Sequence, residues 1–234
     1  MKTSKIIFIS FFSFIGLLLL GIMVLGFAFN DVALAERNEK RAEFKNRIKT
    51  IKIDKRFKHV FVKDKGLVTI TRGDEQLINF YSYNTKDSLD TPEFDVRNDT
   101  LYVIGKRGVN ITIKLKDEST LLSVGGINSN VDLSHLKVPT LDLHFNGGKV
   151  RLNYKVEIGK VRIDLNNKSL LELANQIYVD TICLNVNNSK INTWHGKGHI
   201  SLLKGMVENG SDVRLPDAYH IHLDTDSTSK VTLR

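Results

Sequence analysis

Histidines near the C-terminal end of the chain are the first candidates for chemistry. His220 and His222 would share one face of a strand, since strand side chains alternate. His199 and His220 each stand directly before a predicted repeat, so they could stack in neighbouring coils and form a surface metal site. The repeat places no carboxylate beside them, and we therefore predict no metal and no cofactor. The full cluster is His195, His199, His220 and His222.

Outward-facing carboxylates are the second candidates, because polysaccharide-cleaving β-helix enzymes use stacked acidic and basic residues on an outer face. One predicted outward column reads Asp142, Arg162, Cys183, Ser201, His222, and the next reads His144, Asp164, Asn185, Leu203, Asp224. Each of Asp142 and Asp164 has a basic neighbour, which would keep it ionised and unsuited to general acid catalysis.

Other catalytic signatures are missing from the sequence. It has no Gly-rich phosphate loop, nucleophile elbow or His-Glu-x-x-His motif. The single cysteine, Cys183, excludes an intramolecular disulfide framework and a Cys-rich zinc site. We therefore predict that the chain is not an enzyme.

The elements that would carry these residues are β-strands. From residue 48 onward apolar and polar residues alternate, and no helical period is sustained after residue 50. The segment around Asn98-Asp99 predicts a hairpin turn. Farther on, apolar anchors recur about every 20 residues, each followed two positions later by another apolar residue. The anchors are Leu141, Val161, Ile182, Ile200 and Ile221, and their followers are Leu143, Ile163, Leu184, Leu202 and Leu223.

Such a repeat predicts stacked coils, because one short strand cannot bury its apolar face alone. The predicted fold is all-β, a β-solenoid of about 20-residue coils similar to a β-helix, with Leu143, Ile163 and Leu184 above one another inside. Asn residues end the strands, where they tolerate left-handed backbone and can stack their amides. Lys204 and Gly205 are expected to break the register of the repeat that begins at Ile200. The alternative is a β-sandwich with regularly spaced strands.

An apolar run precedes this body. Residues 6–29 carry no charge and would form a helix of about 36 Å, long enough for one N-terminal transmembrane helix that serves as a signal anchor. The competing interpretation is a signal peptide cleaved after Ala35. The predicted organisation is a cytoplasmic N-terminus (1–5), the span (6–29), a basic juxtamembrane linker (30–50) and the solenoid (51–234).

The positive charge of the chain is concentrated beside that run. Residues 37–65 hold twelve Lys and Arg against four acids, which equals the whole net charge of +8. The remaining body is neutral, which argues against nucleic acid as a partner. The charges nearest the span are predicted to contact anionic lipid; the alternative is a solvated linker. These residues are Arg37, Lys40, Arg41, Lys45 and Arg47.

Those cations would favour a cytoplasmic C-terminal side, yet large domains are exported largely regardless of charge. We expect a single-pass protein of the inner (cell) membrane with a periplasmic, extracytoplasmic body.

The body resembles the head-GIN domain family, bacterial proteins common in Bacteroidetes and named for auto-transporter adhesins. The naming motif is present as Gly126-Ile127-Asn128. The strands around Phe57-Lys58-His59-Val60, Leu67 to Asp74, Asp99 to Val103 and Asn110 to Ile113 follow in the family's order. The chain departs from the family by placing Asn-Asn and Asn-Gly where Ser-Gly turns are frequent. The resemblance implies a β-helix-like fold and a cell-envelope location.

The function predicted from these features is a non-catalytic, envelope-anchored interaction or structural module related to adhesion. Its partners would be membrane lipid through the N-terminal helix and an unknown envelope protein or polysaccharide. The alternative is a glycan-binding or glycan-active β-helix protein.

Overall fold

The computed structural model describes residues 14–23, 33–39, 48–64, 66–82, 92–174, 177–193 and 199–233. The chain divides into two compact units, Met1–Ile48 and Lys49–Arg234. In the first unit, residues 14–23 and 33–39 are helical with exposed side chains. The other parts of the predicted span, 6–13 and 24–29, lie outside the described residues. Within the described part of the chain, no helix has the length and apolar character needed to cross a membrane.

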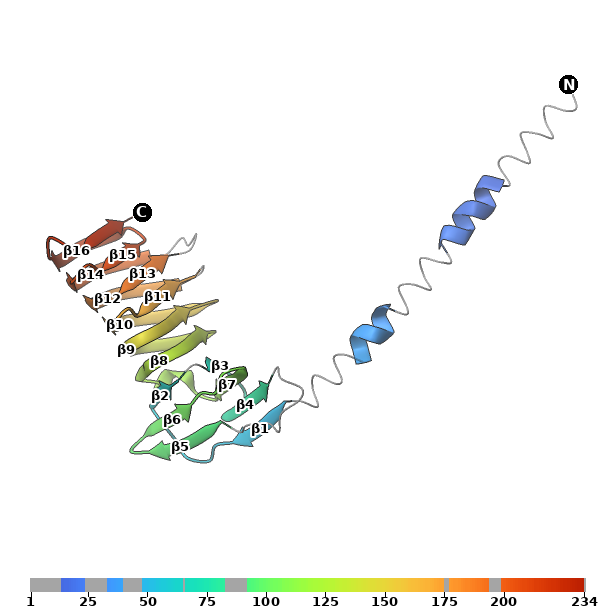
Figure 1. Ribbon diagram of the computed structural model, residues 1–234, viewed down its shortest axis with the longest axis horizontal. Coiled ribbons are helices and arrows are strands. Elements are labelled where there is room, and N and C mark those ends of the chain that lie inside the picture. The colour runs from blue at the N-terminus through green and yellow to red at the C-terminus, as the bar shows by residue number, and fades with distance from the viewer. Residues whose placement is uncertain are drawn as a thin grey trace, which may run out of the picture. The chain divides into compact units, whose positions relative to one another are not determined.

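The second unit is built from strands joined in one continuous sheet (Figure 1). A single short 3-10 helix, η1 (Glu118–Thr120), interrupts them in the described residues. The strands are β1 (Lys49–Lys52), β2 (His59–Lys63), β3 (Leu67–Arg72), β4 (Leu77–Ser82), β5 (Glu93–Arg97), β6 (Thr100–Ile104), β7 (Val109–Leu115), β8 (Ser123–Ser134), β9 (Leu136–Leu152), β10 (Val156–Asn166), β11 (Leu170–Leu173), β12 (Ile177–Asn187), β13 (Lys190–Thr193), β14 (His199–Glu208), β15 (Asp212–Leu215), β16 (Ala218–Thr225) and β17 (Lys230–Leu233).

From β8 to β17 the strands stack in parallel coils, seen as the green-to-red ladder of Figure 1. Each coil of β9 to β17 has three faces. Face A holds 136–140, 156–160, 177–181, 199–202 and 218–220. Face B holds 141–146, 161–166, 182–187, 203–208 and 221–225, and face C holds 149–152, β11, β13, β15 and β17. Buried and exposed residues alternate along β10, but two residues instead of one separate the buried Ile158 from the buried Val161. This change marks the bend from face A to face B.

The predicted interior column is confirmed. Leu143 pairs with Ile163, and Ile163 pairs with Leu184 in the next coil. All three are at most 4% exposed, so they lie inside the stack. Parallel coils in register bury this column continuously, which an isolated strand cannot do. The all-β solenoid prediction is therefore correct for this part of the chain, with coils of about 20 residues.

The predicted register of the β14 coil is wrong. Ile182 pairs with Leu203, which pairs with Ile221, so Leu203 is the anchor and Ile200 belongs to face A. Gly205 takes the inward position that Leu202 was expected to fill. A Cβ on Gly205 would lie 1.9 Å from the Leu184 carbonyl oxygen, at a φ of +137°. The coil therefore continues in register through Gly205 instead of breaking there.

The corner between faces B and C contains the left-handed residues that the Asn pattern predicts. Asn128, Asn167, Asn188 and Asn209 have φ between 45° and 57°. One stacked amide pair is present, because Asn167 Nδ2 donates to Asn146 Oδ1 at 2.7 Å. Most of the bonding along this corner comes instead from a buried serine column, which the sequence reading missed.

The serine column joins successive coils through hydroxyl groups. Ser169, Ser189 and Ser211 are each at most 3% exposed. The hydroxyl of Ser189 accepts the backbone N–H of Ser169, that of Ser211 accepts the N–H of Ser189, and that of Ser229 accepts the N–H of Ser211, each at 3.2 Å. Backbone donors that the turn would leave unpaired are thereby satisfied.

The N-terminal part of the stack departs from a simple solenoid. β2 lies between β6 and β8, and β3 between β7 and β8, so an earlier segment is inserted among later ones. β5, β4 and β1 then add antiparallel strands to the parallel coils. The predicted hairpin is confirmed, since Asn98 and Asp99 both have positive φ (47° and 57°) between β5 and β6. An antiparallel end covers the first coil and limits its exposed edge.

Candidate functional site

The Gly-Gly-Ile-Asn segment of β8 has a packing role. A Cβ on Gly126 would lie 2.0 Å from Ser129 Oγ and 2.8 Å from the Phe145 ring, so only glycine fits there. The side-chain amide of Asn128 fills the space beside Gly147. A Cβ added to Gly147 would lie 2.4 Å from Asn128 Oδ1. The motif thus closes the corner of its coil against the next one.

A compact charge cluster lies on face C. Lys149 Nζ and Arg151 Nη2 contact Glu172 Oε2 at 2.7 and 2.9 Å, and Arg151 also approaches Asp132 at 3.6 Å. Burial alone would raise the pKa of the Glu172 carboxyl, but hydrogen bonds from Lys149 and then Arg151 outweigh it and hold the pKa below its ordinary value. For Asp132, burial dominates over the nearby cations and raises the pKa. Because two acids face two bases, the cluster is internally neutralised and its role is structural.

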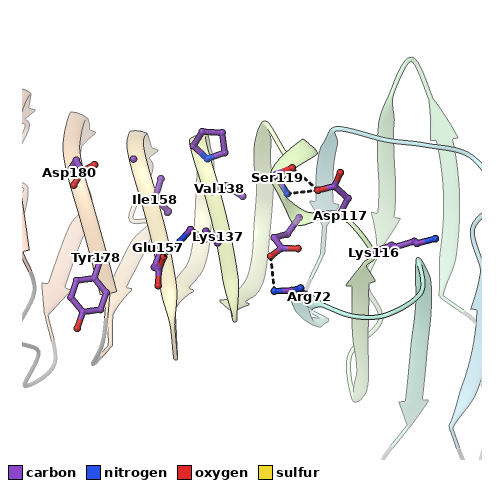
Figure 2. Close-up of a pocket in the computed structure, with 13 residues that line it drawn as sticks. Arg72, Lys116, Asp117, Ser119, Lys137, Val138, Glu157, Ile158, Tyr178 and Asp180 are labelled. Atoms are coloured by element: carbon purple, nitrogen blue, oxygen red, sulfur yellow. Dashed lines mark hydrogen bonds and ion pairs between the residues drawn. The ribbon is translucent and has the colours of Figure 1, made fainter.

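The larger open recess is the groove shown in Figure 2, with a volume of about 890 Å³. Its floor and one wall come from face A, where Lys137, Glu157 and Tyr178 project from β9, β10 and β12. Next to β9, the recess is bordered by Arg72 at the end of β3 and by the segment around η1 that carries Asp117 and Ser119. The groove therefore crosses three consecutive coils. The lining residues are Arg72, Lys116, Asp117, Glu118, Ser119, Lys137, Val138, Pro139, Glu157, Ile158, Gly159, Tyr178 and Asp180.

Charged groups in this groove are largely engaged with one another. Lys137 Nζ lies 2.8 Å from Glu157, and Arg72 lies 3.7 Å from Glu118. The Asp117 carboxylate accepts the hydroxyl and the backbone N–H of Ser119, which fixes the start of η1. Four of the seven charged lining residues are thus held in two ion pairs. Charged groups held in ion pairs are poorly placed to act as the acid and base of a reaction.

A second recess lies on face B and its continuation through β8, β2 and β6; we call it the aromatic recess. Its volume is about 670 Å³, and it is lined by His59, Val60, Phe61, Asn98, Thr100, Tyr102, Ser123, Gly125 and His144. The rings of Phe61 and Tyr102 meet with centroids 5.9 Å apart at 58°. Arg97 lies 6.0 Å from the Tyr102 centroid on the neighbouring strand.

The aromatic recess depends on the inserted strand. Phe61 pairs with Tyr102 on one side and with Gly125 on the other, and Gly125 pairs with His144. The sequence pattern predicted no site at these residues. The outward alternation of Phe61 and Tyr102 was visible, but their contact depends on the order of strands in the stack.

The predicted outward ion pairs are confirmed. Arg162 lies 3.6 Å from Asp142, and His144 Nδ1 lies 3.6 Å from Asp164. The columns continue differently from the prediction, because the corrected register places Lys204 and Met206 where Ser201 and Leu203 were expected. Ser201 belongs to face A, and Leu203 points into the core.

The predicted histidine stack is also affected by that register. His220 pairs with Leu202, while the backbone of His199 pairs with Tyr178, so these two histidines are not opposite each other. His220 and His222 are exposed on β16. His195 and the side chain of His199 lie outside the described residues. Among the side chains that the structure describes, no three His, Cys, Asp or Glu residues are grouped to hold a metal ion.

Of the predicted lipid-contacting cations, Arg37 is exposed in the helical segment 33–39. Lys40, Arg41, Lys45 and Arg47 lie outside the described residues, so their role stays a prediction.

The fold and its recesses define a β-solenoid with two open recesses on its surface. No known protein family matches the chain by sequence, and no curated protein matches it either. Solved structures do share its fold. A "putative adhesin" from Bacteroides fragilis NCTC 9343 aligns over 80% of this chain and 96% of its own, with 12% identity and a TM-score of 0.51. A second "putative adhesin", from Parabacteroides distasonis ATCC 8503, aligns over 80% and 92%, with 12% identity and a TM-score of 0.54.

Proposed function

We propose that this chain is a non-catalytic, adhesion-related interaction module of the cell envelope. The observation that carries the proposal is the groove of Figure 2, an open surface across three coils whose charges are mostly paired. A stack of hydrogen-bonded coils holds such a surface in fixed shape, which lowers the entropic cost of binding a partner. The names of the two structures that share the fold, and the Gly126-Ile127-Asn128 resemblance to the head-GIN family, support the same reading.

Retention of the purified full chain on coated surfaces tests this function, because it does not require the body to lie outside an intact cell. The chain in mild detergent is passed over plastic coated with mucin, collagen or fibronectin, and the retained amount is compared with that on blocked, uncoated plastic. We expect retention on at least one coating and its loss in Lys137→Glu, which breaks the 2.8 Å pair with Glu157 inside the groove. Lys190→Glu is the matched control, since Lys190 is exposed on face C. Retention on all three coatings that does not exceed retention on blocked plastic contradicts the proposal.

Attachment to the membrane is part of the proposal. Residues 6–29 are the proposed anchor, with the body on the extracytoplasmic side of the inner membrane. The uncleaved chain is expected in the membrane fraction with its original N-terminus. A mature N-terminus at Glu36 would mean that the apolar run is a cleaved signal.

The proposed lipid contact of the linker is tested separately. Each Lys or Arg held near an anionic surface gains about 1 kcal/mol. A peptide of residues 36–50 should bind vesicles that contain anionic lipid, release as salt rises, and lose binding when its five candidate cations become Gln. These are Arg37, Lys40, Arg41, Lys45 and Arg47. Absence of binding at low salt would leave the segment as a linker only.

A second candidate function is glycan binding, and the aromatic recess favours it. Glycan cleavage is less well supported, because Asp142 and Asp164 each contact a basic side chain at 3.6 Å. General acid catalysis needs a carboxyl group that stays protonated, and a cationic neighbour opposes this.

A further inference from the structure

We propose that the aromatic recess binds a neutral pyranose unit of a glycan. This inference develops the second candidate function and does not depend on the groove of Figure 2. It names the ligand class, and it assigns contact with the ligand to Tyr102, Phe61, His59 and His144.

The absence of permanent charge from the recess argues for a neutral ligand. Charged residues make up 26% of the chain, yet none of the nine residues lining this recess is Asp, Glu, Lys or Arg. The groove of Figure 2 has seven such residues. Arg97, whose guanidinium lies 6.0 Å from the Tyr102 ring centroid, is already ion-paired with Asp95. A charged ligand would therefore leave water without meeting an unpaired opposite charge in the lining of the recess, which is unfavourable. A neutral polyhydroxyl ligand carries no such cost.

The aromatic pair supplies an apolar platform. Tyr102 is 41% exposed, so part of its surface is open on the outer side of β6. Phe61 meets it at 58° and forms the second side of an apolar corner. Gly125, next in the same row, has no side chain, and a Cβ there would come within 3.2 Å of the Phe61 ring. The floor beside the corner therefore stays open, and the C–H face of a sugar ring can pack against the electron-rich ring faces.

Polar side chains border this corner. His59 Nδ1 and Ser123 Oγ are hydrogen-bonded at 2.7 Å. This bond fixes the imidazole ring and leaves Nε2 as the ring nitrogen that a ligand could contact. His144 forms the far side, held by Asp164 at 3.6 Å. Imidazole nitrogens and hydroxyl groups can both hydrogen-bond to the hydroxyls of a sugar. A few fixed polar groups around an apolar platform are typical of small-ligand sites.

Histidine NMR signals of the wild-type chain provide a direct test. The full chain in mild detergent is titrated with cellohexaose, maltohexaose or chitohexaose, and the ring Cε1–H signals of its seven histidines are followed. We expect at least one of these sugars to shift the His59 and His144 signals and to leave those of His135 and His222 in place. Sorbitol, which has hydroxyls but no ring face, should shift none of them.

Tyrosine variants add a second measurement. Tyr102→Ala should weaken the binding by about tenfold, because the platform is lost. Tyr154→Ala removes a tyrosine of comparable exposure, 59%, that lines neither recess, and should leave binding within about twofold. Tyr102→Phe should retain it.

Two outcomes overturn the proposal. One is that no hexaose shifts His59 or His144; the other is that the shifts appear only at other histidines. Either result leaves the adhesion-related function standing if the purified chain is still retained on coated surfaces. Conversely, sugar binding without that retention would support this site and contradict the broader function.

Discussion

The serine column offers a matched pair of substitutions with opposite expected effects. Ser169 Oγ is buried, accepts the backbone N–H of Gly147 at 2.9 Å and donates toward the carbonyl oxygens of Asn166 (2.6 Å) and Phe145 (3.1 Å). Ser129 belongs to the same column, but its hydroxyl is the one buried side-chain polar atom without a hydrogen-bond partner in the described part of the chain. Gly148 stands opposite Ser129 and supplies no hydroxyl.

Ser169→Ala should therefore be destabilising. It leaves the Gly147 N–H unpaired in a buried corner, which costs about 1–3 kcal/mol, and we expect about 2 kcal/mol. For a folded unit of this size, that corresponds to a fall in Tm of roughly 4–8 °C. Ser129→Ala removes a hydroxyl that is already unpaired, so the free energy of unfolding should stay constant or rise by up to about 1 kcal/mol.

Urea titration and calorimetry of the full chain measure both variants against the parent. The same probe is used for each, because stacked coils need not unfold in one step. Equal losses in the two variants, or a larger loss in Ser129→Ala, would refute the reasoning that the serine hydroxyls stabilise the corner by pairing its backbone donors.

Three further predictions concern the buried core, the close packing at Gly126 and the loss of stability at low pH. Ile163→Asp puts a charge at a position that is 0% exposed and should cost about 3 kcal/mol or more, while outward Arg162→Asp should cost under about 1 kcal/mol. Equal losses of the two variants in urea titration contradict the inside–outside assignment. Gly126→Ala places a Cβ 2.0 Å from the Ser129 hydroxyl and should lower the free energy of unfolding by about 1–3 kcal/mol. Gly125→Ala should cost less, because its nearest contact would be at 3.2 Å. Calorimetry that finds the reverse order contradicts the close packing described at Gly126. Hydrogen bonds from the Ser229 side chain and then the Asn209 backbone lower the pKa of Asp226 to about 2, so the stabilising effect of this carboxylate is full above pH 3.8 and is lost as pH falls toward 2. Asp226→Asn should therefore flatten the dependence of Tm on pH in that window. An unchanged slope would contradict this role of Asp226.

The β-strands, the turns and most of the repeat could be predicted because their signals are local. Alternation in Val109–Leu115 reports one buried face, and the Asn98-Asp99 pair suits a turn with two positive φ values. The register of the β14 coil was predicted wrongly, because Ile200 and Leu203 are both apolar and both lie near the expected repeat spacing. Only pairing with Ile182 and Ile221, and the close approach of Gly205, selects Leu203.

The candidate sites divide in the same way. The ion pairs Asp142–Arg162 and His144–Asp164 follow from the repeat, because neighbouring coils bring equal positions together. The aromatic recess does not, since the contact of Phe61 with Tyr102 requires β2 to be inserted between β6 and β8.

The sequence by itself therefore determined the β character, the coil length and the inward column that begins with Leu143 and Ile163. Tertiary structure decided the order of the first coils, the register at Leu203 and the side chains that line each recess. The physical reason is that alternation and spacing record which residues of one coil are buried. They do not record which coil lies beside it, because that depends on backbone pairing and side-chain packing between segments far apart in the chain.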